Sequence, residues 1–212
     1  MPTYSSKIFE ASNLHLAKEV ILTPSENKGT DDRWKIESPY LASLLGDYLE
    51  LKPGQIVVDY GCGIGRISKL IIERYDCRVL GVDISQSMRG LAPGYVDSPA
   101  FSAISRSMLQ ALVEAGLQVD AAISVWVLQH CLNPREDIAL IRQALKMRAP
   151  LGVVNMIRRA VPTEADGWVN DGIDVAALLA SLLTPVETGE LDPELVGAKT
   201  AEHTFWGVYH RG

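Results

Sequence analysis

The sequence predicts an α/β protein built around a mostly parallel β-sheet, and three observations carry this prediction. From residue 55 onward, short apolar runs of strand length alternate with amphipathic segments of helical periodicity, a pattern typical of βαβ units. The first apolar run leads directly into a glycine-rich turn and then into a helix. With 212 residues, 47% of them hydrophobic and 22% charged, the chain has enough apolar surface for a buried core and lacks the composition of a disordered protein.

The first 50 residues are predicted to be helical and to form a cap or lid. Two stretches place apolar residues at helical spacing, and each is followed by a proline that ends it. Ser38 and Pro39 are the expected N-cap and first residue of the second helix. We expect a helix over residues 7–22, a polar loop over 25–30 and a helix over 39–49, so that residues 1–50 form the cap and 51–212 the main domain.

The remaining elements follow the alternation of strands and helices. Apolar runs bounded by turn residues predict strands, and apolar residues at every third or fourth position predict helices. Residues 158–172 are polar and are expected to form a long loop. The predicted strands are 56–59, 78–83, 100–104, 119–125, 151–156, 184–188 and 204–209, and the predicted helices are 66–75, 85–92, 107–115, 134–146 and 174–183.

The glycine-rich turn is the most informative stretch. Gly61, Gly63 and Gly65 follow an apolar strand at alternate positions, and glycines at such a turn let the backbone approach a ligand that any Cβ would hold off. Two carboxylates frame the turn, Asp59 before it and Asp83 at the end of the next strand. A carboxylate at the end of the second strand of a βαβ unit is placed to accept hydrogen bonds from ribose hydroxyls. The sequence therefore predicts a nucleoside site.

Two kinds of nucleoside ligand fit this arrangement. Counted from Gly63, the turn approximates a dinucleotide motif with Ser68 at its last position, and Asp83 lies 83 − 63 = 20 residues further on, as an NAD site requires. Asp59, however, would place a negative charge beside the pyrophosphate of a dinucleotide, and it suits a positively charged ligand better. Only one mononucleotide-binding unit is visible. Both ligands remain open at this point.

Three motifs together resemble the class I S-adenosylmethionine-dependent methyltransferases. They are the glycine turn over residues 59–65, Gly81-Val82-Asp83-Ile84-Ser85 after the next strand, and the segment from Asp120 to His130. The resemblance covers roughly residues 55–156. It implies a Rossmann-like, mostly parallel seven-stranded sheet with helices on both faces and an antiparallel C-terminal strand, and it implies S-adenosyl-L-methionine as the cofactor. A cationic sulfonium and an ammonium group suit the carboxylates around the turn.

The resemblance also implies roles for individual residues. The glycines would line the cofactor, Asp59 would face its amino-acid and sulfonium end, and Asp83 would hold its ribose. Adenine would lie beside Ile84 and Met88. The acidic residue that often follows the third strand in this family is missing here, so the Ser105 hydroxyl is an expected adenine contact. The complete set of expected cofactor residues is Asp59, Gly61, Cys62, Gly63, Gly65, Asp83, Ile84, Met88, Ser105 and Trp126.

The substrate is expected at the same edge of the sheet, because ligands of open parallel sheets bind beyond the carboxyl ends of the strands. His130, after the fourth strand, is the candidate catalytic base, since an imidazole with an unperturbed pKa of roughly 6.5 suits proton removal at neutral pH. The long loop after the fifth strand carries the charged, aromatic and amide side chains of a functional loop. The expected substrate-binding residues are Gln129, Asn155, Arg158, Trp168 and Asn170, and no metal site is expected.

Composition and charge exclude several classes of partner. The formal net charge of −6 argues against a large basic surface for nucleic acid or anionic lipid. No apolar run approaches the roughly 20 residues that span a bilayer, and the N-terminus lacks the pattern of a secretory signal. The three cysteines form no C-x-x-C pair, which argues against a zinc site or a disulfide framework. We expect a cytoplasmic monomer or homodimer that binds a small-molecule substrate, with neither a nucleic-acid nor a membrane partner.

The sequence thus predicts a methyltransferase that moves a methyl group onto an O, N or C atom of a small molecule by in-line displacement. Two alternatives stay open. One is an NAD(P)-binding reductase that uses the glycine pattern counted from Gly63. The other is a catalytically silent partner subunit that binds the cofactor, and it predicts a lid that leaves no room for a second ligand.

Overall fold

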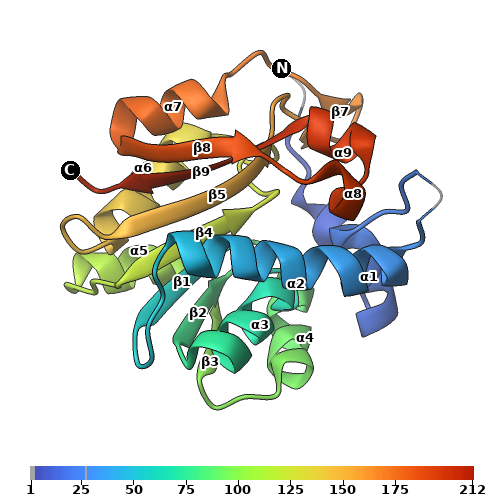
Figure 1. The fold of residues 1–212 in the computed structure, drawn as a ribbon. Coiled ribbons are helices and arrows are strands. Elements are labelled where there is room, and N and C mark those ends of the chain that lie inside the picture. Colours follow the sequence, from blue (N-terminus) through green and yellow to red (C-terminus); the bar gives the residue numbers. More distant parts are fainter. Residues whose placement is uncertain (1–2, 27) are drawn as a thin grey trace.

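A seven-stranded β-sheet runs through the centre of the protein (Figure 1). The computed structural model describes residues 3–26 and 28–212. The strand order is β3-β2-β1-β4-β5-β9-β8, in which β1 to β5 pair in parallel and β9 runs antiparallel to both of its neighbours. This confirms the predicted sheet. The strands are β1 (Ile56–Tyr60), β2 (Arg78–Val82), β3 (Phe101–Ile104), β4 (Ala121–Val125), β5 (Pro150–Met156), β8 (Thr184–Glu190) and β9 (Thr204–His210).

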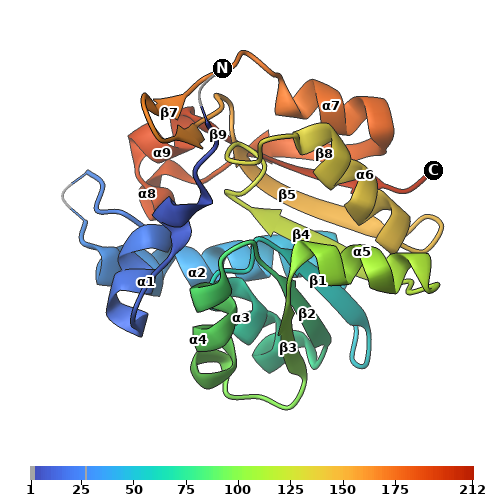
Figure 2. The same cartoon turned by 180° about the vertical axis from the view of Figure 1, so that it is seen from behind.

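Helices cover both faces of the sheet, α2, α3 and α4 on one face and α5, α6 and α7 on the other (Figure 2). Adjacent residues of β1 serve the two cores separately, because side chains alternate along a strand. Val57 is buried with the helices of the first face and Val58 with those of the second. The helices are α2 (Thr30–Tyr48), α3 (Arg66–Tyr75), α4 (Gln86–Val96), α5 (Arg106–Glu114), α6 (Pro134–Ala144) and α7 (Val175–Leu182).

The N-terminal helices differ from the prediction. The single helix expected over 7–22 is divided into a short 3₁₀ helix, η1 (Ser6–Phe9), and α1 (Leu14–Ile21). Asn13 separates them, because its side chain caps α1 by accepting a 3.0 Å hydrogen bond from the Leu16 amide. In addition, the Glu10 carboxylate accepts hydrogen bonds from the backbone amides of Gln86 and Ser87, the first two residues of α4.

The helix expected from residue 39 begins nine residues earlier, at Thr30, so Ser38 is not its N-cap and Pro39 lies inside it. Pro39 removes one helical hydrogen bond. The packing of α2 offsets that loss, because Leu41 and Leu45 are fully buried against the sheet. Tertiary burial therefore overrides the local signal of the proline.

Two regions that connect β5, β8 and β9 contain more structure than expected. The loop over 158–172 forms a hairpin of β6 (Val161–Thr163) and β7 (Gly167–Val169), and the N-terminal segment pairs with it through the Ser5 amide, which donates to the Pro162 carbonyl at 3.0 Å. Two short helices, α8 (Pro193–Val196) and α9 (Ala198–Glu202), precede β9 and were not predicted. In the part of the chain that the structure describes, no helix is both long and apolar enough to cross a membrane.

Candidate functional site

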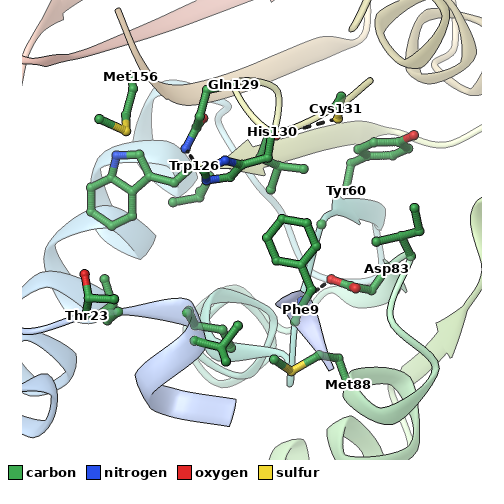
Figure 3. A pocket seen from close by; sticks show the side chains of 18 of the residues that line it. Phe9, Thr23, Tyr60, Asp83, Met88, Trp126, Gln129, His130, Cys131 and Met156 are labelled. Atoms are coloured by element: carbon green, nitrogen blue, oxygen red, sulfur yellow. Dashed lines mark hydrogen bonds between the residues drawn. The ribbon is translucent and has the colours of Figure 1, made fainter. Parts of the chain in front are cut away.

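A cavity of about 810 Å³ lies at the carboxyl ends of the central parallel strands. Its wall includes the residues at or just after the ends of three strands, Gly61 after β1, Asp83 after β2 and Trp126 after β4. Figure 3 shows side chains from these strand ends and from the N-terminal segment around one space. This is the position at which open parallel sheets bind their ligands.

The glycine turn has a backbone that other residues adopt only with strain. Gly61, Gly63 and Gly65 have φ angles of 80°, 55° and 86°, in the left-handed region that favours glycine. A Cβ at Gly61 would also lie 2.1 Å from a Val127 methyl carbon. The turn is held to the next strand because the Gly63 amide donates a 2.8 Å hydrogen bond to the carboxylate of Asp83. The turn and the acid that the sequence singled out therefore form one unit.

Asp83 faces the cavity with a carboxylate that is already oriented. One oxygen accepts from Gly63, and the other accepts from the amide of Ser85 at 2.8 Å. Burial raises the pKa of this carboxyl. Ile84 and Met88 line the cavity beside it. Met88 is buried, whereas Ile84 is half exposed, so the two apolar side chains frame the region expected for adenine.

Asp59 lies behind the turn rather than in the wall of the main cavity. Its carboxylate accepts a 2.6 Å hydrogen bond from the hydroxyl of Ser68. Burial raises the pKa of Asp59 to about 6. Together with Cys62 it borders a hollow of about 30 Å³ that shares Gly61 and Gly63 with the main cavity. Gly65 borders neither space, and it serves as the N-cap residue of α3.

His130 sits in the cavity wall in a defined orientation. Its Nδ1 lies 2.6 Å from the Ala160 carbonyl, which can only accept, so Nδ1 carries the proton and Nε2 keeps its lone pair. Nε2 lies 3.2 Å from the side-chain nitrogen of Gln129. Burial lowers the pKa of His130 below its usual value, so the ring is neutral at pH 7.

An aromatic cluster surrounds this histidine in the cavity wall. The ring centroid of His130 is 5.0 Å from that of Trp168 on β7 and 5.7 Å from that of Phe9 on η1. Trp168, Phe9 and Tyr4 all line the cavity. Tyr4 was expected in a lid over this edge of the sheet, whereas Phe9 was not singled out from the sequence, because no local pattern links it to a hairpin some 160 residues later.

Besides Asp59, Cys62 and Gly65, four more of the expected site residues lie outside the cavity wall. Asn155 is buried, and its side-chain oxygen accepts from the Gln129 amide, so it connects β5 to the loop after β4. Ser105 caps α5 by accepting from Met108. Asn170 accepts from Gly172, and the Arg158 side chain is exposed.

The neighbouring arginine, Arg159, is the buried one. It pairs with Asp171 through two hydrogen bonds of 3.0 and 2.9 Å and donates to the Leu128 carbonyl. This pairing lowers the pKa of Asp171. Arg159 therefore fixes the loop that carries Trp168 and is already fully engaged.

The strand order defines the class of the protein. A dinucleotide-binding sheet has six parallel strands in the order 3-2-1-4-5-6, whereas here an antiparallel β9 is inserted between β5 and β8. This is the Rossmann-like fold of the class I methyltransferases, and it disfavours the NAD(P) alternative.

Comparison with known proteins gives the same result. Residues 57–152 match a family model described as a methyltransferase domain. This match and the shared fold support a class I S-adenosylmethionine-dependent methyltransferase, a class whose cofactor is S-adenosylmethionine.

Solved structures support the fold over the whole chain. The geranyl diphosphate C-methyltransferase of Streptomyces coelicolor A3(2), in complex with Mg²⁺, geranyl diphosphate and S-adenosyl-L-homocysteine, has a TM-score of 0.67. The two sequences are 15% identical, and the similarity covers 100% of this chain and 91% of that one. At this level of identity the likeness concerns the fold.

Curated relatives match in sequence over shorter regions. The cyclopropane-fatty-acyl-phospholipid synthase of Escherichia coli (strain K12) is 26% identical over 165 residues, which is 74% of this chain and 42% of that enzyme. The phosphoethanolamine N-methyltransferase of Triticum aestivum is 50% identical over 46 residues, 22% of this chain and 9% of that enzyme. The chain thus spans less than half the length of these relatives.

Proposed function

We propose that this protein transfers the methyl group of S-adenosylmethionine to an oxygen, nitrogen or carbon atom of a small molecule. One observation carries the proposal. The left-handed glycine turn and the Asp83 carboxylate are joined by the 2.8 Å hydrogen bond from Gly63 at the edge of an 810 Å³ cavity. This arrangement suits a nucleoside whose ribose hydroxyls donate to Asp83 while its remaining part lies along the turn.

The residues present fit the cofactor of the class. Gly61 and Gly63 lie in the cavity wall without side chains of their own, so a ligand can approach the backbone of the turn there. Asp83 retains lone pairs beyond the two amide hydrogen bonds that orient it. When bound, the cofactor supplies an electrophilic methyl group on a positively charged sulfur.

The chain itself would align the acceptor, exclude water and take up a proton where the acceptor carries one. We assign the uptake of the acceptor's proton to Nε2 of His130. This nitrogen keeps its lone pair because Nδ1 donates to the Ala160 carbonyl. The Gln129 side chain, 3.2 Å away, donates to the same lone pair and has to give way to the substrate. Trp168 and Phe9 would exclude water from this end of the cavity.

The size of the cavity favours an enzyme over a catalytically silent subunit. Sites for drug-sized ligands occupy about 300–1,000 Å³, and the volume of about 810 Å³ lies near the upper end of that range. The silent-subunit alternative predicted a lid with no room for a second ligand. We therefore favour a site that holds a cofactor and a small acceptor together.

The identity of the acceptor does not follow from the relatives. Their names point to a phospholipid acyl chain, to phosphoethanolamine and to geranyl diphosphate, which are chemically unrelated. We further propose that η1 and α1 form the cap over the cavity, because their residues Phe9 and Ile21 lie in its wall. A cytoplasmic, monomeric or homodimeric state remains part of the proposal.

Isothermal titration with S-adenosyl-L-homocysteine tests the proposed function. We expect one site per chain, and S-adenosyl-L-homocysteine should raise the unfolding temperature while NAD(H) and NADP(H) should not, since a ligand that binds only the folded state stabilises it. The absence of binding at millimolar ligand would refute the proposal. Stabilisation by nicotinamide dinucleotides alone would support the reductase instead.

A further inference from the structure

Arg66 is a buried cation without an anionic partner. It is the first residue of α3, directly after the glycine turn, and only 4% of its surface is exposed. Its one hydrogen bond is a long contact of 3.4 Å from Nη1 to the hydroxyl of Ser38, although a guanidinium carries five donors. Among the described residues, no carboxylate lies within 4.0 Å of it, while seven other pairs meet that distance.

The nearby acidic groups are already engaged elsewhere. Glu37 pairs with Arg33 through hydrogen bonds of 2.6 and 3.0 Å. Asp59 accepts a hydrogen bond from Ser68, and burial raises its pKa to about 6 although the charge of Arg66 acts in the opposite direction. Burial in turn lowers the pKa of Arg66 to about 10. An unpaired charge of this kind is costly unless a ligand completes it.

Two tryptophans hold the guanidinium at the cavity. Its Cζ lies 5.6 Å from the ring centroid of Trp34 on α2 and 5.4 Å from that of Trp126 after β4, which are favourable cation–π distances. Trp126 has a φ of 56°, an uncommon conformation for a bulky residue. The Arg66 side chain borders both the main cavity and the hollow behind the turn, as do Gly61 and Gly63.

We propose that Arg66 binds the carboxylate of the amino-acid part of the cofactor. This inference rests on the proposed function and assigns its anion-binding residue. S-adenosylmethionine has a single anionic group, the α-carboxylate, at the end of the molecule opposite the adenine. With Asp83 holding the ribose, the amino-acid part extends along the glycine turn towards the first turn of α3. Arg66 is the cation at that end, and its planar fork suits a carboxylate.

The experiment compares two ligands that differ in the amino-acid group, which carries the carboxylate. S-adenosyl-L-homocysteine contains the amino-acid group, whereas 5′-methylthioadenosine keeps the adenosine and the sulfur but lacks that group. Calorimetry on wild type, Arg66→Met and Arg66→Lys gives the affinity of each ligand. In Arg66→Met we expect an about 10- to 100-fold loss for S-adenosyl-L-homocysteine and no change beyond twofold for 5′-methylthioadenosine. Arg66→Lys should lose less affinity for S-adenosyl-L-homocysteine, because lysine keeps the positive charge but lacks the planar pair of donors of a guanidinium.

Lys69→Met is the matched control. Lys69 lies one turn further along α3, and its ammonium donates to the Tyr95 carbonyl, away from the cavity wall. This variant removes the same charge from the same helix and should bind both ligands as the wild type does. Near-UV circular dichroism verifies that each variant is folded.

Three outcomes would overturn the inference. Equal losses for both ligands in Arg66→Met would mean that Arg66 only supports the fold, and an unchanged affinity for S-adenosyl-L-homocysteine would mean that it does not touch the ligand. Binding of inorganic pyrophosphate that depends on Arg66, with S-adenosyl-L-homocysteine unaffected, would assign the cation to an anionic substrate. If wild type bound neither nucleoside, the proposed function itself would fail, which is a separate result.

Discussion

Gly61 should be among the positions of the turn least able to accept a side chain, and Gly61→Ala tests this. The φ of 80° at this position costs a non-glycine residue about 1–2 kcal/mol. The added Cβ would lie 2.1 Å from one methyl carbon of Val127, and overpacking of this kind costs about 1–3 kcal/mol. We therefore expect Gly61→Ala to lower the free energy of unfolding by about 2–5 kcal/mol.

Gly116→Ala separates the two costs. Gly116 also has a left-handed backbone, with a φ of 96°, but a Cβ there meets no atom within 4 Å. Only the conformational cost of about 1–2 kcal/mol should appear. The clash itself is isolated by Val127→Ala combined with Gly61→Ala, and a coupling energy of about 1 kcal/mol or more is expected between the two sites.

Urea unfolding followed by circular dichroism measures these energies, with the slopes compared among variants to verify that the unfolded states are alike. A loss in Gly61→Ala no larger than in Gly116→Ala would refute the reasoning. So would the absence of coupling to Val127, because the contact of the added Cβ is the only reason to expect the extra cost.

Three further predictions concern carboxylates and the histidine of the site. Asp83→Ala should weaken binding of S-adenosyl-L-homocysteine by about 1.5–3 kcal/mol in calorimetry through loss of charge-assisted hydrogen bonds, and an unchanged affinity would show that the ribose assignment is wrong. His130→Ala should lower turnover about 100-fold or more while sparing cofactor affinity; equal turnover would remove the base role. Burial raises the pKa of Asp59 to about 6 from 3.8, so the folded state binds the proton more tightly than the unfolded state, and stability should fall as pH rises from about 4 to about 6. Relative to Asp59→Asn in urea unfolding, this loss should be on the order of 1–3 kcal/mol, and parallel pH profiles would contradict it.

The sequence predicted the parallel core of the protein well, because strand and helix periodicity coincide there with strong turn residues. The predicted helix over 66–75 is α3 to the residue, since the left-handed Gly65 precedes it and Asp76 ends it in a left-handed conformation. The order and spacing of Gly61, Gly63 and Asp83 likewise indicated that they belong together, and a hydrogen bond links Gly63 to Asp83.

The periphery was less predictable because long-range contacts determine it. The Glu10 carboxylate binds the first amides of α4, which interrupts the helical pattern of the N-terminus. Similarly, the sequence of residues 158–172 predicted a polar loop. In the structure these residues form a hairpin, and the N-terminal segment pairs with it at Pro162. Such partners lie 76 or more residues away, beyond the reach of local patterns.

The same limit applies to the candidate site. Arg66 stands at the start of an amphipathic helix, where a solvated cation is ordinary, and only Trp34 and Trp126 reveal that it is buried at the cavity. Conversely, Arg158 was an expected substrate contact, but its side chain is exposed, whereas the neighbouring Arg159 is buried and pairs with Asp171. Burial, which decides the role of a charge, depends on packing that the sequence alone does not give.

A crystal structure of the complex with S-adenosyl-L-homocysteine tests the central claim most directly. We predict that the ribose hydroxyls lie within hydrogen-bond reach of the Asp83 carboxylate and that the sulfur lies between the glycine turn and His130. A nucleoside bound outside this cavity, or an Asp83 carboxylate that contacts no ribose oxygen, would contradict the account.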